Sequence, residues 1–229
     1  MKPHESWKVL PHGSIERLAD RLYTVTGKLK MPLGETTRRM TLAQLTGGRL
    51  AIYSAIALAE PEMNRLEALG KPTFLIVPSG IHRLDVKPWK DRYPDLVVIA
   101  PAGARDKIGE VVGVDCTSVE VGDPNVRVFS VPGTADRELA MVAGKTLVVN
   151  DLIFNMPRLK GAAQLVYRLL GFGPGHATIP KLVAMKLVDD KTVVKAQLRR
   201  WANDGFERLV VAHGEPIENP RETLMALAA

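Results

Sequence analysis

Three apolar segments of the chain are each followed by residues that can bind a metal ion or transfer a proton. The segments cover residues 74–77, 146–150 and 208–212, and the residues that follow them are His82 and Asp85, Asp151, and His213. Imidazole nitrogens and carboxylate oxygens are common ligands of zinc, iron and manganese. Because loops at strand ends often carry functional side chains, this pattern predicts metal-ligand chemistry where the three segments end.

The segments that must position these residues are short and rich in Val, Ile and Leu, which is typical of strands buried on both faces. We expect strands at residues 21–26, 40–45, 50–54, 73–77, 96–100, 126–131, 138–143, 146–150 and 208–212. Helices are predicted between them, at residues 61–69, 105–111 and 191–202 and after Pro220, with Asp190 as an N-cap. The order of elements predicts a mixed α/β chain.

Length and composition favour one globular domain. The chain has 229 residues, of which 46% are hydrophobic and 24% charged, so we expect a domain over residues 21–229 after an N-terminal tail of residues 1–20. No apolar stretch reaches the roughly 18 residues that span a bilayer, and the first residues lack the apolar core of a signal peptide. The single cysteine, Cys116, fits a reducing compartment. We therefore expect a cytoplasmic protein.

The positive charge is concentrated late in the chain. Residues 158–200 hold nine Lys or Arg against two Asp, while the whole chain carries a net charge of +6. This segment includes an apolar helical run at residues 159–170 and a second apolar, basic run at 179–188. Three interpretations stay open: a helical layer with its lysines in solvent, a cover over an acidic substrate, or a surface that contacts a membrane or a partner. Few aromatic residues are present, and none interleave with basic ones, which disfavours nucleic-acid binding.

The arrangement of these segments resembles the metallo-β-lactamase superfamily, whose fold places two β-sheets between helices. The resemblance runs from Leu22 to His213 and rests on the segments at residues 22–27, 50–55, 76–85, 131–134, 151 and 210–214. It implies a four-layer αββα sandwich of the α+β type. Within this domain we expect a basic helical segment at about 157–188 to cover the site.

The metal motif of this family departs from its usual form in the present chain. The family motif is Thr-His-x-His-x-Asp-His, and this chain reads Ser79-Gly80-Ile81-His82-Arg83-Leu84-Asp85. Only the second histidine is kept. Thr134 replaces the histidine of the Pro-Gly-His turn, and Tyr53 occupies the position of an aspartate that supports the metal loop in the family. Asp151 and His213 are in place, so the chain resembles a divergent member of the family with a degenerate motif.

By this resemblance, one metal position retains His82 and Asp151, and the other retains Asp85, Asp151 and His213. Three protein ligands with open positions for water are typical of a catalytic mononuclear site. Two carboxylates and one imidazole form a hard ligand set, which favours manganese or iron(II), with zinc as a further option. We therefore expect one metal ion or none, and no other cofactor.

Two functions follow from this reading. The first is a metal-dependent hydrolase that cleaves an ester, thioester or phosphodiester in a small substrate. An acidic group on that substrate would suit the basic segment. Leu84 stands where the family has a proton-accepting aspartate, and Glu215, His82 and His176 are candidates for the base, with nothing in the sequence to select among them. The alternative is an inactive member that binds a small ligand or a protein partner in the former cleft. The oligomeric state is open.

Overall fold

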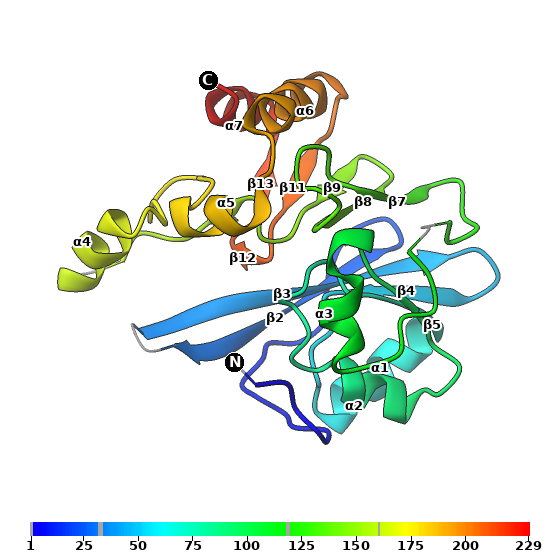
Figure 1. The fold of residues 1–229 in the computed structure, drawn as a ribbon. Coiled ribbons are helices and arrows are strands. Elements are labelled where there is room, and N and C mark those ends of the chain that lie inside the picture. The colour runs from blue at the N-terminus through cyan, green and yellow to red at the C-terminus, as the bar shows by residue number, and fades with distance from the viewer. Residues whose placement is uncertain (1, 32–33, 118–119, 160) are drawn as a thin grey trace.

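Two β-sheets pack face to face between two layers of helices (Figure 1). The computed structural model describes residues 2–31, 34–117, 120–159 and 161–229. The four-layer αββα sandwich predicted from the sequence is confirmed, and so are the expected strands and helices. Among the described residues, no helix combines the length and the apolar character that crossing a membrane would require.

The first sheet has six strands in the order of the sequence, antiparallel from β1 to β4 and parallel from β4 to β6. Its strands are β1 (Glu16–Ala19), β2 (Leu22–Met31), β3 (Gly34–Leu45), β4 (Arg49–Tyr53), β5 (Lys71–Ile76) and β6 (Val97–Ile99). The helices that follow these strands are α1 (Glu60–Leu69), α2 (Val86–Arg92) and α3 (Arg105–Gly109).

The second sheet has the strand order β13-β11-β9-β8-β7, in which only β9 and β11 run parallel. Its strands are β7 (Val126–Ser130), β8 (Leu139–Ala143), β9 (Thr146–Val148), β11 (Arg208–Val210) and β13 (Ile217–Glu218). A separate parallel pair is formed by β10 (Phe154–Asn155) and β12 (His213–Gly214). The later helices are α4 (Ala162–Leu169), α5 (Lys181–Leu187), α6 (Lys191–Asn203) and α7 (Arg221–Leu227).

Among the described residues, apolar side chains form three large core layers and a fourth, smaller cluster around Phe154. The central layer joins the two sheets, with Ile76 from the first and Met141 from the second both fully buried. The outer layers hold the helices on the sheets, through residues such as Trp89 of α2 and Trp201 of α6. Asp190 caps α6 as predicted, because its side chain accepts the backbone N–H groups of residues 192 and 193.

Two regions differ from the sequence expectation. The hairpin of β2 and β3 is longer than predicted, since its outer half consists mostly of polar residues, which carry no buried-strand pattern but still pair through the backbone. The first 20 residues, expected as a tail, pack on the first sheet. Residues 16–19 form β1, the Trp7 indole donates to the Leu58 carbonyl at 2.9 Å, and His12 accepts the Ala59 N–H at 3.0 Å.

Candidate metal centre

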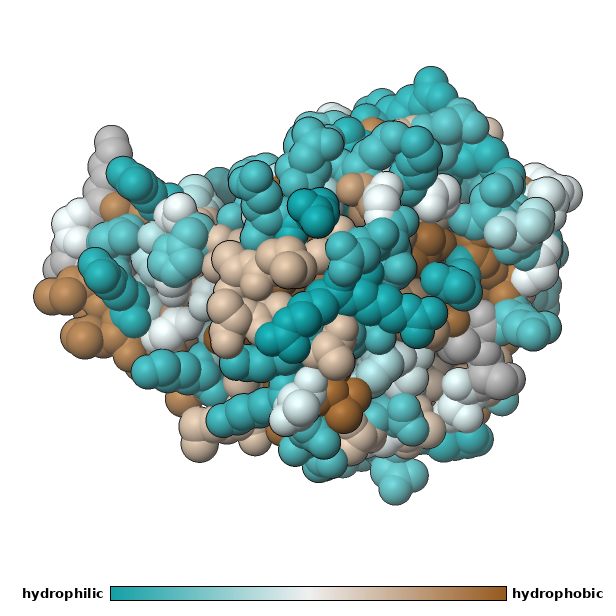
Figure 2. Space-filling view, turned by 90° about the horizontal axis from the view of Figure 1, so that it is seen from above, coloured by the Kyte–Doolittle hydropathy of each residue, from teal (hydrophilic) through white to brown (hydrophobic). Residues whose placement is uncertain are grey.

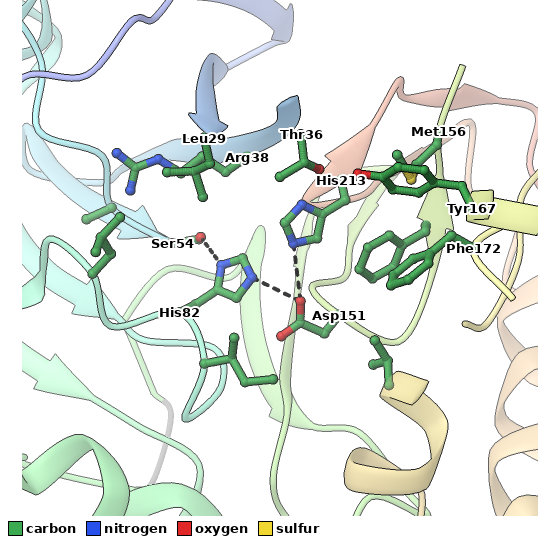
Figure 3. A pocket seen from close by; sticks show the side chains of 15 residues that line it. Leu29, Thr36, Arg38, Ser54, His82, Asp151, Met156, Tyr167, Phe172 and His213 are labelled. Atoms are coloured by element: carbon green, nitrogen blue, oxygen red, sulfur yellow. Dashed lines mark hydrogen bonds and ion pairs between the residues drawn. The ribbon is translucent and has the colours of Figure 1, made fainter. Parts of the chain in front are cut away.

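His82, Asp151 and His213 converge on one point at the edge of the sandwich (Figure 3). The Nε2 atom of His82 lies 3.0 Å from Asp151 Oδ1, and the Nε2 atom of His213 lies 3.4 Å from the same oxygen. One ligand atom from each residue lies within 4.8 Å of the other two. The structure therefore brings together three of the four metal ligands that the sequence predicted.

Strand order explains why residues so far apart in the chain meet here. His82 lies in the loop after β5, Asp151 follows β9, and His213 begins β12 just beyond β11. Because β9 and β11 run parallel and adjacent, the residues after them emerge at the same edge of the sheet. Phe154 of β10 pairs with His213, and its ring stacks on the imidazole with the centroids 4.5 Å apart.

Hydrogen bonds to the far side of each imidazole orient both rings. The Nδ1 atom of His213 lies 2.6 Å from the Thr37 carbonyl oxygen, which can only accept, so Nδ1 carries the proton. In the neutral ring, Nε2 then directs its lone pair toward Asp151. The Nδ1 atom of His82 contacts the Ser54 hydroxyl at 2.8 Å. Partners of this kind fix the tautomer and orientation of metal-binding histidines.

Asp151 is held equally firmly. The Ser79 hydroxyl donates to its Oδ2 at 2.9 Å, which leaves Oδ1 to face the two imidazoles. Burial alone would raise the pKa of Asp151, but His82 and His213 together lower it well below its usual range. Asp151 therefore presents a carboxylate rather than a carboxylic acid to the centre of the cluster.

Glu138 supports the loop that carries Asp151, and sequence reasoning missed it. Its fully buried carboxyl group accepts the backbone N–H groups of Asn150, Asp151 and Leu152 at 3.1 to 3.2 Å. Burial, and next the charge of Asp151, raises the pKa of Glu138 well above its usual value, and the three N–H donors oppose that rise. The available signal was an acidic residue in a strand predicted to be buried. Ser54, the other missed residue, is an ordinary serine at a strand end and carries no such signal.

Asp85 does not reach the cluster. Its fully buried carboxylate turns away, with Oδ1 at 2.8 Å from His4 Nδ1 and Oδ2 accepting from Arg38 at 2.5 Å. The resemblance placed Asp85 among the ligands by its position in the motif, but the N-terminal segment and β3 supply partners that hold it elsewhere. Leu84, its neighbour, lines the cavity instead.

Two of the three candidate bases, Glu215 and His176, lie apart from the cluster. The side chain of Glu215 is 71% exposed, and its nearest charged partner is Arg39 at 3.9 Å. His176 lines a separate surface hollow together with Arg158 and Arg168. Neither residue lines the cavity beside the metal-ligand cluster, whereas His82 does.

A cavity of about 350 Å³ opens over the three ligands (Figure 3). Its wall is mainly apolar and includes Phe154, Met156, Tyr167, Phe172 and Val183. Three of these, Tyr167, Phe172 and Val183, belong to the basic segment at 157–188. The described part of this segment therefore contributes apolar side chains to the cavity wall. Its described Arg and Lys side chains are exposed, and Lys160 lies outside the described residues.

By sequence, the chain matches no protein-family model and no curated protein. By structure, it is similar to the metallo-β-lactamase FIM-1 from Pseudomonas aeruginosa in its mono-zinc form, with 11% identity, a TM-score of 0.63 and 96% of each chain covered. It is also similar to DIM-1 metallo-β-lactamase exposed to ceftazidime, with 11% identity and a TM-score of 0.64 over 96% of this chain and 98% of that one. VMB-1 at pH 5.5 shows 12% identity and a TM-score of 0.66 over the same shares. The chain therefore has the metallo-β-lactamase fold.

Proposed function

We propose that this protein is a metal-dependent hydrolase that binds one divalent ion through His82, Asp151 and His213. The observation that supports this most is the convergence of two imidazole Nε2 atoms on a single carboxylate oxygen, at 3.0 and 3.4 Å. In a tetrahedral site with ion-to-nitrogen distances of about 2.0–2.1 Å, the ligand atoms lie about 3.3 Å apart. The two nitrogen-to-oxygen distances therefore match those expected of ligand atoms that share one metal ion.

The hydrogen-bond pattern supports the same conclusion. The Thr37 carbonyl holds the proton of His213 on Nδ1, so in a neutral ring Nε2 has only a lone pair. This lone pair faces Oδ1 of Asp151, which also can only accept a hydrogen bond. Two acceptors that face each other in a mostly buried site are stabilised by a cation between them, and a divalent ion would take the place of the proton that otherwise makes His213 an imidazolium. Two imidazoles with one carboxylate suit zinc or iron(II), so the preference for manganese that rested on Asp85 no longer applies.

A divalent ion bound there would polarise a carbonyl or phosphoryl oxygen and lower the pKa of a water molecule. The chain itself supplies position and an enclosed environment. Ser54, Ser79 and the Thr37 carbonyl hold the ligands in place. Phe154, Met156 and Phe172 offer an apolar surface to the part of the substrate next to the scissile bond. This wall favours a small ester, thioester or phosphodiester with an apolar group over a strongly acidic substrate.

The test is the metal content of protein purified without chelator and re-equilibrated with zinc, iron(II) and manganese. We expect about one ion per chain, lost in an Asp151→Ala, His213→Ala variant. His176→Ala is the matched control, because it removes a histidine outside the cluster and should retain the ion. Chromogenic esters, thioesters and phosphodiesters then identify the bond. Absence of bound metal in the unmodified protein would overturn the proposal.

Leu84 and the apolar wall also support a second candidate, a metal-free protein that binds an apolar ligand in the cavity. This candidate predicts no ion above background in the metal measurement. It also predicts that a fluorescent fatty acid binds, and that a bulky substitution such as Val183→Trp blocks it. The hydrolase proposal instead predicts that the protein that binds the probe also contains about one metal ion per chain. Metal content and probe binding, measured on the same protein, therefore separate the two candidates.

A further inference from the structure

Exposed apolar side chains gather on α4 and α5. Of the nine large apolar side chains that are exposed among the described residues, five belong to these two short helices. They are Leu165 at 60%, Val166 at 38%, Leu169 at 77%, Leu182 at 47% and Met185 at 81% exposure. Exposed apolar groups gathered in one place mark an interaction surface, whereas single ones are ordinary.

Both helices are apolar on two sides. Tyr167 of α4 and Val183 of α5 face inward and line the cavity, while Leu169 and Met185 face solvent. In Figure 1, α4 stands away from the two sheets at one end of the molecule, and α5 lies nearer the second sheet. Figure 2 shows apolar atoms gathered at that same end, beside polar ones. The inward faces are explained by the cavity, and the outward faces have no partner among the described residues.

Within the segment that carries this apolar surface, the charge has one sign. Residues 152–188 contain no Asp or Glu but contain Arg158, Lys160, Arg168, Lys181 and Lys186. The four of these that are described are exposed. A short helical segment with outward apolar groups and flanking Lys and Arg matches the chemistry of an anionic lipid surface, where apolar groups enter the acyl boundary and cations contact phosphates.

We propose that α4 and α5 dock this protein on the surface of an anionic membrane. A second copy of the chain fits less well, because a symmetric contact through this surface would bring two basic patches together. The exposed Ile81 also lines the cavity, so the cavity opens beside apolar surface and not only beside polar groups. Docking would also bring the cavity close to substrates that partition into membranes. This last point, the supply of substrate, rests on the proposed function.

The experiment is co-sedimentation with vesicles of phosphatidylcholine alone and with about 30 mol % phosphatidylglycerol. We expect binding at least about tenfold stronger to the anionic vesicles, weakened by about 0.5 M salt. Leu169→Ser, Met185→Ser should reduce this binding about tenfold or more, because both side chains are exposed and contribute apolar area. Arg168→Gln, Lys186→Gln should reduce the preference for anionic vesicles.

The matched control is Val193→Ser, Met225→Ser, which removes two exposed apolar groups from α6 and α7 and should bind vesicles as the unmodified protein does. The Asp151→Ala, His213→Ala variant should also bind normally, so docking and metal-dependent function can fail separately. Circular dichroism confirms that each variant is folded. Equal binding to both vesicles, or binding unaffected by the α4 and α5 substitutions, would overturn the proposal. Concentration-dependent dimerisation lost in Leu169→Ser, Met185→Ser, without vesicle binding, would replace it with self-association.

Discussion

Ser54 offers a way to separate the orientation of a metal ligand from the stability of the backbone that carries it. Its backbone has a φ of 58°, in the left-handed region, and its hydroxyl contacts His82 Nδ1 at 2.8 Å. Its N–H donates to the Ile76 carbonyl at 3.0 Å, which fixes the strand end in this conformation. Strain of this kind is found at functional sites that the surrounding structure holds in place.

Ser54→Ala and Ser54→Gly both remove the hydroxyl, so both leave the His82 ring without that partner. Loss of such a partner weakens metal binding by about 10- to 100-fold, which corresponds to about 1.4 to 2.7 kcal/mol. The two variants differ only in the backbone. A left-handed conformation costs a residue with a Cβ about 1 to 2 kcal/mol, and glycine loses about 0.5 to 1 kcal/mol more on ordering. Ser54→Gly should therefore be more stable than Ser54→Ala by about 0.5 to 1 kcal/mol.

Zinc affinity is measured by competition with a chromophoric chelator, and the free energy of unfolding by urea denaturation of the metal-free proteins. We expect equal losses of affinity in the two variants, with the glycine variant the more stable. Met156→Leu is the control, because Met156 also lines the cavity and, in the described part of the chain, its side chain forms no hydrogen bond with His82, Asp151 or His213. Unchanged zinc affinity in Ser54→Ala would refute the role assigned to the hydroxyl.

Two further predictions concern the connection of the sheets and the second histidine. Burial would raise the pKa of Asp123, but two backbone N–H donors and Arg21 outweigh this and lower it, so the ionised form stabilises the fold above the unfolded pKa of about 3.9. Asp123→Asn should lower the free energy of unfolding by about 2 to 3 kcal/mol at pH 7. In urea titrations this difference from the unmodified protein should shrink as the pH falls below about 4. A difference that stays constant with pH would contradict the ionic role. Gly214 has a φ of 112°, and a Cβ there would lie 1.9 Å from the Asn155 carbonyl oxygen. Gly214→Ala should therefore displace the neighbouring histidine and abolish metal binding, while Gly144→Ala, also at positive φ but in open space, should leave the metal content unchanged.

Much of the fold was predictable because its strands are buried on both faces. Continuous Val, Ile and Leu runs mark such strands without reference to their neighbours, as in residues 146–150 and 208–212. The outer part of the β2–β3 hairpin escaped prediction because its backbone pairing requires no apolar side chains. Glu138 was assigned only to a strand, since its role depends on the backbone N–H groups of a loop 12 to 14 residues later.

Sequence alone determined which residue types follow the strands, and so it indicated His82, Asp151 and His213 as ligands before any geometry was known. Tertiary structure decided which way each side chain faces. Asp85 shares the same loop as His82, but His4, 81 positions away in the chain, and Arg38 hold its carboxylate on the far side. A buried carboxylate turns to whichever cations and donors the fold places around it, and those partners come from distant segments that no local motif specifies.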